Sequence, residues 1–264
     1  MKKALSIILA AVIALSVLSV AAAASDKDDL CFAIASDLHY SATEKVLEKT
    51  NDDPIFWYAN RRCAMENESG WIIDEFLNQC AESDDVDFVL IAGDLANKGR
   101  TRPEDHYAVA EKLRAFEEKS GKQVYVINGN HDAGENQETN FALFKRIYAD
   151  FGYDQALTMR EDDCSYTADL GSKYRLIALD SNHRTKSTED GMTKEKLSWV
   201  KEQAELAKKD GRYPILMMHH NLLDHLPIQR VLSRNFIVKF HFTTAELFAD
   251  WGIKTVFTGH EHCS

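Results

Sequence analysis

A short apolar segment near the middle of the chain stops abruptly at residues that can bind metal and move protons. Residues 123–127 read as a buried strand, and the sequence Asn128-Gly129-Asn130-His131-Asp132 follows directly. Neighbouring side chains of an extended chain point to opposite sides, so Asn130 and His131 cannot both serve the same atom. We therefore expect the Asn130 amide oxygen to bind a hard cation and His131 to face a substrate, with Asp132 orienting its ring. The alternative is that these residues form only a turn, since Asn, Gly and Asp are common turn residues.

Four other apolar segments end in the same way. Residues 30–35, 86–92, 213–218 and 253–258 each read as a short strand followed by polar residues. Those polar residues are Asp37, His39, Asp94, His219, His260 and His262. Asp37 and His39 are two positions apart, as are His260 and His262, so each pair shares one face while the backbone stays extended. A lone Asp-x-His match would be weak evidence, because so short a motif often arises by chance.

Helical segments separate most of these strands. Pro103 and Gly121 bound one predicted helix, and Thr193 caps another that runs to about residue 209. Residues 71–80, 141–148 and 244–251 also follow helical spacing, whereas residues 165–170 and 174–180 read as a hairpin. The alternation predicts an α/β fold and, taken alone, an open parallel sheet. The strand ends of such a sheet line one crevice, where the polar clusters would meet.

The clustered residues offer only nitrogen and oxygen as ligands. Together with Asn130 they make seven donors, which suffices for two divalent ions if one carboxylate is shared. The five cysteines are too widely spaced for a thiolate zinc site: Cys31, Cys63, Cys80, Cys164 and Cys263. Their odd number leaves at least one unpaired within the chain, and the apolar surroundings of Cys31 and Cys80 predict buried thiols.

The ordered series of motifs resembles the calcineurin-like metallophosphoesterase family. The series is DxH, GDxxxxG, GNHD, HH and GHxH, and it runs from Asp37 to His262. The resemblance implies a four-layer α/β/β/α sandwich with the motifs on loops above the sheets. Members of the family usually continue with further strands after the last motif, whereas two residues follow His262 here. We therefore expect either a short second sheet or an incomplete C-terminal end.

The resemblance also implies a role for each of the seven donors. One metal ion would be held by Asp37, His39 and His262. The other would be held by Asn130, His219 and His260, with Asp94 bridging the two. His219 is preferred to His220 because the family ligand directly follows the strand, which leaves His220 facing the pocket or solvent. Iron, manganese and zinc all suit these donors.

The remaining histidines are expected to have no part in the chemistry. His106 reads as a solvated helix position, and the other three fall in predicted loops: His183, His225 and His241. Residues 40–67 read as a surface insertion. The alternative is a lid whose arginines, Arg61 and Arg62, meet a phosphate.

The activity implied by the resemblance is hydrolysis of phosphate mono- or diesters. We expect in-line attack by a hydroxide that bridges the two ions, with His131 assisting the leaving group and Asp132 orienting His131. The substrate would be small and phosphorylated, because a net charge of -11 disfavours nucleic acid as a large-area partner. The alternative is a catalytically silent metal-binding or protein-binding module on the same fold.

The first 24 residues have the layout of a secretory signal peptide. Lys2 and Lys3 precede an apolar run that ends in four alanines at positions 21–24. We expect cleavage near Ala24 and a secreted or extracytoplasmic phosphoesterase domain of residues 25–264. An uncleaved anchor helix is the alternative, which so short a run, rich in Ala and Ser, disfavours. No other apolar run is long enough to cross a membrane, so no membrane partner is expected after cleavage.

Overall fold

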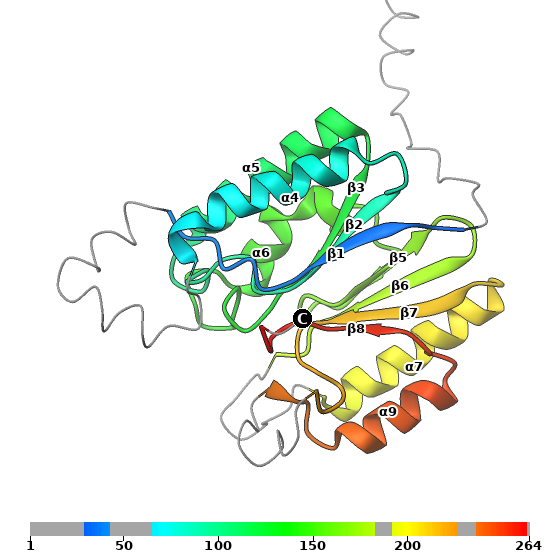
Figure 1. Cartoon of the computed structure of the whole chain (residues 1–264). Coiled ribbons are helices and arrows are strands. Elements are labelled where there is room, and N and C mark those ends of the chain that lie inside the picture. Colours follow the sequence, from blue (N-terminus) through cyan, green and yellow to red (C-terminus); the bar gives the residue numbers. More distant parts are fainter. Residues whose placement is uncertain (1–28, 43–64, 183–191, 226–235, 263–264) are drawn as a thin grey trace, which may run out of the picture.

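Two β-sheets pack face to face in the computed structural model, with helices on both outer sides (Figure 1). The structure describes residues 29–42, 65–182, 192–225 and 236–262. Helices α4 (Ser69–Glu82) and α5 (Pro103–Ser120) cover one sheet, and α7 (Lys194–Lys209) and α9 (His241–Asp250) cover the other. The four-layer α/β/β/α sandwich implied by the family resemblance is therefore confirmed.

The first sheet is parallel and leads to the first three motifs. Its order is β1 (Phe32–Ala35), β2 (Phe88–Ala92) and β3 (Gln123–Ile127). Ala35 pairs with Ile91, and Ile91 pairs with Val126, so the three strands end at nearly the same level. Because parallel strands place their carboxyl ends at one edge, the loops that follow them emerge side by side.

The second sheet is mixed. Its order is β4 (Thr158–Met159), β5 (Tyr166–Leu170), β6 (Tyr174–Leu179), β7 (Tyr213–Met218) and β8 (Val256–Phe257). The first three strands pair antiparallel, whereas β6, β7 and β8 pair in parallel. The predicted hairpin is therefore confirmed, but a single open parallel sheet is wrong, because the hairpin belongs to a second sheet that packs on the first.

Strand β6 shows how the second sheet is covered on both faces. Leu176 and Ala178 belong to the core between the two sheets, whereas Ile177 and Leu179 belong to the core shared with α7 and α9. All four are fully buried. Such a strand has a continuous apolar sequence whether a helix or another sheet covers it, so local pattern could not identify the covering layer.

The helices mostly begin and end where their capping residues predict. Pro103 opens α5, and Gly121 closes it with a φ of 70°. The side chain of Thr193 accepts a hydrogen bond from the Lys196 backbone at the start of α7. The apolar stripe predicted from Phe141 onwards forms α6 (Phe141–Ile147), and two short turns, η1 (Glu66–Glu68) and η2 (Ala149–Tyr153), complete the described helical elements.

Two predicted apolar faces are more exposed than expected. Ile34 on β1 is 41% exposed, because β1 lies at the end of the strand order in the described part of the first sheet. Trp71 is 68% exposed, since α4 buries the face that carries Ile73, Leu77 and Cys80. An apolar run does not reveal whether a strand is central or at an edge.

The cysteines of the described ranges are free thiols. Cys31 is exposed, which corrects the prediction that it is buried, whereas Cys80 and Cys164 are buried. Burial raises the pKa of both buried thiols, which makes them unreactive. Cys63 and Cys263 lie outside the described residues. Within the described residues, no helix is both long and apolar enough to cross a membrane.

A buried lysine ties α7 to the ends of both sheets. Lys196 is 1% exposed, and its ammonium group donates to the Asp180 carbonyl and lies 3.5 Å from the Asp163 carboxylate. Asp180 in turn accepts a hydrogen bond from the side chain of Asn128, at 3.1 Å, directly after β3. Because an unpaired buried charge costs several kcal/mol, these contacts fix the relative position of the strand ends.

Glu117 on α5 makes the stability of the fold depend on pH. Burial raises the pKa of Glu117 from 4.5 to about 7, although its carboxylate accepts a hydrogen bond from the Val124 backbone. Between these two values the folded chain binds the proton that the unfolded chain has lost, so stability falls as the pH rises. We expect Glu117→Gln to raise the free energy of unfolding at about pH 8 by on the order of 1 kcal/mol, after allowance for solvent screening.

Urea denaturation of both proteins measures this difference. At about pH 5 the gain should be mostly absent, because the folded wild-type carboxyl is then protonated. An equal gain at both pH values would show that a contact, rather than the buried charge, is responsible.

Candidate metal centre

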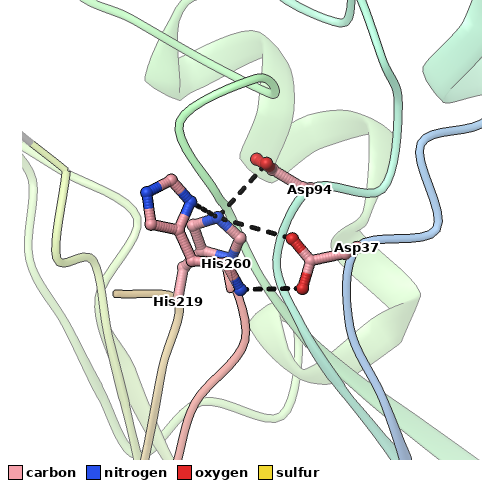
Figure 2. Close-up of side chains that lie close together, drawn as sticks. All are labelled: Asp37, Asp94, His219 and His260. Carbon is pink, nitrogen blue, oxygen red and sulfur yellow. Dashed lines mark hydrogen bonds and ion pairs between the residues drawn. The ribbon is translucent and has the colours of Figure 1, made fainter. Parts of the chain in front are cut away.

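Four strand ends bring polar side chains together. The loops after β1, β2, β7 and β8 contribute Asp37, Asp94, His219 and His260, which face one another in Figure 2. One possible ligand atom from each of the four lies within 4.8 Å of the others. His219 Nε2 is 3.2 Å from Asp94 Oδ2 and 3.0 Å from His260 Nδ1. Residues more than 200 positions apart in the chain therefore share one small volume.

Asp37 also belongs to a second group, with His39 and His262. One atom from each of these three lies within 4.8 Å of the others. His262 Nε2 is 3.0 Å from His39 Nε2 and 3.3 Å from Asp37 Oδ1. Asp94 Oδ2 lies 3.6 Å from His39 Nε2 as well as close to His219, so Asp94 stands between the two groups.

Asn130 joins the set from the end of β3. Its side-chain oxygen lies 3.1 Å from His219 Nε2. The structure therefore places all seven predicted ligands in one crevice: Asp37, His39, Asp94, Asn130, His219, His260 and His262.

The loops that carry these residues adopt an uncommon backbone conformation. Six non-glycine residues within the described ranges have a positive φ, and five are predicted ligands: Asp37, His39, Asp94, His260 and His262. Each such residue costs on the order of 1 kcal/mol, and strain of this kind gathers at functional sites. Hydrogen bonds hold it in place here, since the Asp37 and His39 backbones donate to the carbonyls of Gly93 and Asp94, both at 2.9 Å.

One glycine in each of the motifs GDxxxxG, GNHD and GHxH allows two ligand loops to approach closely. A Cβ at Gly129 would overlap Asp94 Oδ1, and one at Gly93 would lie 2.7 Å from His219 Nδ1. A Cβ at Gly259 would lie 2.7 Å from Asp37 Oδ2. Each glycine precedes one predicted ligand and touches another, so the motifs specify the packing of the loops as well as the ligands.

The carboxylates and imidazoles strongly perturb one another. Burial alone would raise the pKa of Asp37, but His262, His39 and His219 hold it well below its usual range. Burial would raise the pKa of Asp94 as well, but His219, His131 and His39 together lower it. Burial opposes a charged His219, yet the two carboxylates raise its pKa to about 9. A proton on His219 thus compensates part of the carboxylate charge, and a bound cation would displace it.

The arrangement of lone pairs fits metal ions. Two pairs of imidazole nitrogens face each other at 3.0 Å, His39 with His262 and His219 with His260. Asp37 Oδ1 is buried and accepts no hydrogen bond from the described residues, although three imidazoles lie 3.3, 3.7 and 4.0 Å away. Nitrogen and oxygen atoms that converge at these distances are donors that suit iron, manganese or zinc.

Comparison with known proteins agrees with this geometry. The family model described as calcineurin-like phosphoesterase matches residues 31–264. The chain belongs to this family. A search of curated protein sequences finds no match.

A solved structure shares the fold of this phosphoesterase, and a second was compared with it. A dimetal phosphatase from Danio rerio aligns with a TM-score of 0.53 and 12% identity, over 88% of this chain and 81% of the other. GAP50, described as the anchor in the inner membrane complex of Plasmodium, aligns with a TM-score of 0.48 and 13% identity, over 88% and 65%. At these identities the likeness concerns the fold alone.

His131 lies beside the ligand set. One atom from each of His131, His39 and Asp94 lies within 4.8 Å of the others. The His131 Nδ1 atom is 2.6 Å from the Asn97 carbonyl oxygen. Because a carbonyl can only accept, Nδ1 carries the proton, and Nε2 of the neutral ring is left for a substrate.

Asp132 does not orient His131, contrary to the prediction. Its carboxylate accepts hydrogen bonds from the backbones of Gly129, at 2.7 Å, and Ala96, at 3.0 Å, and so joins two ligand loops. Its carbonyl lies 3.0 Å from Nε2 of His106. His106 is fully buried on α5, so the solvated position predicted for it is also wrong.

The other histidines have different surroundings. His220 is 2% exposed and packs its ring 4.5 Å from that of His260, so it does not face solvent. Ser181 Oγ lies 2.9 Å from its Nδ1. His241 is the first residue of α9 rather than a loop residue, and His225 lies in a loop. His183 lies outside the described residues.

Two cavities border the ligand set. One, of about 340 Å³, is lined by Asp37, His262 and three residues not identified from sequence: Asn221, Glu261 and Ser36. The other, of about 490 Å³, lies between Asp37, His39 and His262 and the segment that carries Glu66. The place of Glu261 inside GHxH could have drawn attention to it, whereas Glu66 falls in the aperiodic residues 40–67. Arg61 and Arg62 of the same segment lie outside the described residues.

Gly129→Ala should damage metal binding without replacing any ligand. Its methyl group would overlap Asp94 Oδ1 and push that side chain out of place. We expect affinity for added Mn²⁺ to fall by about 10- to 100-fold, as for other changes that displace a ligand. Isothermal titration calorimetry on metal-stripped protein measures the affinity.

Gly211→Ala is the matched control. Gly211 has a φ of 74° but no atom within 4 Å of the position that a methyl group would take, so the change should cost some stability and leave metal affinity intact. Unchanged affinity in Gly129→Ala would mean that Asp94 does not need its present position to bind metal.

Proposed function

We propose that this protein hydrolyses small phosphate esters at a centre of two metal ions. The observation that carries the proposal is the convergence of seven oxygen and nitrogen donors around Asp94. Membership of the calcineurin-like phosphoesterase family supports the reaction class. A complete donor set together with a nearby imidazole favours an enzyme over a silent binding module.

In this proposal Asp94 is shared between two ligand groups. Asp37, His39 and His262 would hold one ion, because their donor atoms already lie within 4.8 Å of one another. The other ion would be held by Asn130, His219 and His260, whose atoms meet at His219 Nε2. The short distances from Asp94 to His39 and His219 support a bridging role.

The donor residues and His131 have different roles in the proposed hydrolysis of phosphate esters. Two bound ions would supply an activated water molecule and neutralise charge on the phosphoryl oxygens. The donor residues would hold the two ions at fixed places, because their strained loops are locked by backbone hydrogen bonds. The protonated form of His131 gives a proton to the departing oxygen from Nε2, while Nδ1 stays bonded to Asn97.

Replacing Asp94 and His131 should separate metal binding from catalysis. Asp94→Ala removes the shared ligand, so we expect loss of both metal content and turnover. His131→Ala should keep the metals and lose about 10²- to 10⁴-fold in kcat, since only proton transfer is removed. Elemental analysis and hydrolysis of phenyl phosphate, whose strongly basic leaving group needs a proton, measure the two effects.

Two exposed or peripheral residues provide controls. Asp84→Ala removes an exposed carboxylate, and His241→Ala removes a histidine at the start of α9; neither should change metal content or rate. Full activity of Asp94→Ala would end the two-ion proposal. Metal binding by the wild type without hydrolysis of any ester would instead favour the silent module.

Both phosphate mono- and diesters suit a two-metal centre. Rates on phosphomonoesters, linear diesters and cyclic diesters, with each metal returned in turn to stripped protein, assign the ester class and the metal. The acidic chain, with a net charge of -11, favours small substrates over nucleic acid.

We also propose that the protein is exported. The support is the order of Lys2 and Lys3, an apolar run and four alanines in the first 24 residues. Expression of the full chain in a host with a secretory pathway should yield an extracytoplasmic protein that begins at Ser25, as read by mass spectrometry. A full-length chain retained in the cytoplasm would contradict export, and one held in the membrane would indicate an anchor.

A further inference from the structure

Glu66 is a buried acid at the edge of the ligand crevice. It lies in η1 just before α4, is 4% exposed, and lines the cavity of about 490 Å³ with Asp37, His39 and His262. It belongs to none of the three groups of possible metal ligands in the described residues. A carboxylate in this place needs another explanation, because burying a charge is costly unless it is strongly hydrogen-bonded.

One oxygen of Glu66 joins the first two ligand loops. Oε1 accepts hydrogen bonds from the hydroxyl of Ser41, at 2.6 Å, and from the side-chain amide of Asn97, at 2.5 Å. Ser41 follows the DxH motif, and Asn97 lies within GDxxxxG. The Asn97 backbone also donates to the Tyr40 carbonyl, at 3.0 Å, so Asn97 is held from both its main chain and its side chain.

Asn97 is the residue that orients His131. Its carbonyl accepts the Nδ1 hydrogen of the imidazole at 2.6 Å, and the carboxylate of the neighbouring Asp132 binds the Gly129 backbone instead. A carbonyl moves with its peptide plane, so the position of the ring depends on what fixes Asn97.

We propose that Glu66 is a positioning residue that holds His131 in its working orientation through Asn97. The path runs from the Glu66 carboxylate to the Asn97 amide, and from the Asn97 carbonyl to the His131 ring. This inference rests on the proposed function, in which His131 assists the leaving group. Loss of the Glu66 oxygen leaves the Asn97 amide and Ser41 hydroxyl without this acceptor and frees the Asn97 peptide to rotate.

Leaving groups of different basicity test the proposal. Phenyl phosphate releases a strongly basic phenolate that needs a proton, whereas 4-nitrophenyl phosphate releases a weakly basic one. We expect Glu66→Ala to lower kcat about 10- to 100-fold on phenyl phosphate but only about threefold or less on 4-nitrophenyl phosphate, because proton transfer alone is impaired. KM and metal content should not change.

Two variants act as controls. Glu66→Gln keeps an oxygen acceptor and should restore both rates, which also guards against a folding defect in Glu66→Ala. Ser41→Ala removes the other hydrogen bond to the same oxygen without touching Asn97, and it should leave the dependence on leaving group unaltered. In a His131→Ala background, Glu66→Ala should have no additional effect, since the two changes remove one function.

A spectroscopic measurement gives an answer that does not depend on activity. In the metal-free chain, ¹⁵N NMR of His131 should show the Nδ1-protonated tautomer in the wild type and in Glu66→Gln, and a mixture of tautomers in Glu66→Ala. Equal loss on both esters, loss of metal, or an unchanged tautomer in Glu66→Ala would overturn the role of Glu66. If the wild type hydrolyses no ester, the proposed function fails, and the tautomer measurement still decides whether Glu66 positions His131.

Discussion

Two buried carboxylates surrounded by four imidazoles set the conditions that the rest of the structure meets. Asp37 and Asp94 lie where burial penalises their charge, and positive charge nearby must offset that penalty. A proton on His219 provides part of it in the metal-free chain, and two cations would provide more. The carboxylates and imidazoles must therefore lie close to one another. The left-handed backbone of five ligands and the missing side chains at Gly93, Gly129 and Gly259 make this approach possible.

Strained loops keep their shape only if the elements beneath them are rigid, and the two sheets provide that rigidity. The alternation in β6 places one set of side chains between the sheets and the other beneath α7 and α9, so this strand is fixed from both sides. Lys196 and Asp180 then connect the end of this layer to Asn128, two residues before the Asn130 ligand. The position of the crevice is thus set by an apolar core and a buried polar network together.

The sequence predicted the site better than it predicted the surroundings of the site. Strand ends could be located because apolar runs stop at Asp37, Asp94, Asn130 and His219, and the spacing of the motifs indicated which residues would converge. Exposure was harder to predict, since Ile34 is apolar but at a sheet edge, and His106 is polar but enclosed by Tyr148 and the Asp132 carbonyl. The exposure of a side chain depends on which element packs against it, and local periodicity does not contain that information.

The orientation of His131 illustrates the same limit and has a chemical consequence. Adjacency in sequence suggested that Asp132 would hold the ring, but residues 130–132 form a turn, and the Asp132 carboxylate instead joins the loops of Gly129 and Ala96. The task falls to a backbone carbonyl. A carbonyl has no protonation equilibrium near neutral pH, so it keeps Nδ1 as the donor whatever the charge of the crevice. The direction of the Asn97 carbonyl, however, depends on how firmly the Asn97 peptide is held. The buried hydrogen bond between Asn97 and Glu66 therefore contributes to the orientation of the His131 ring.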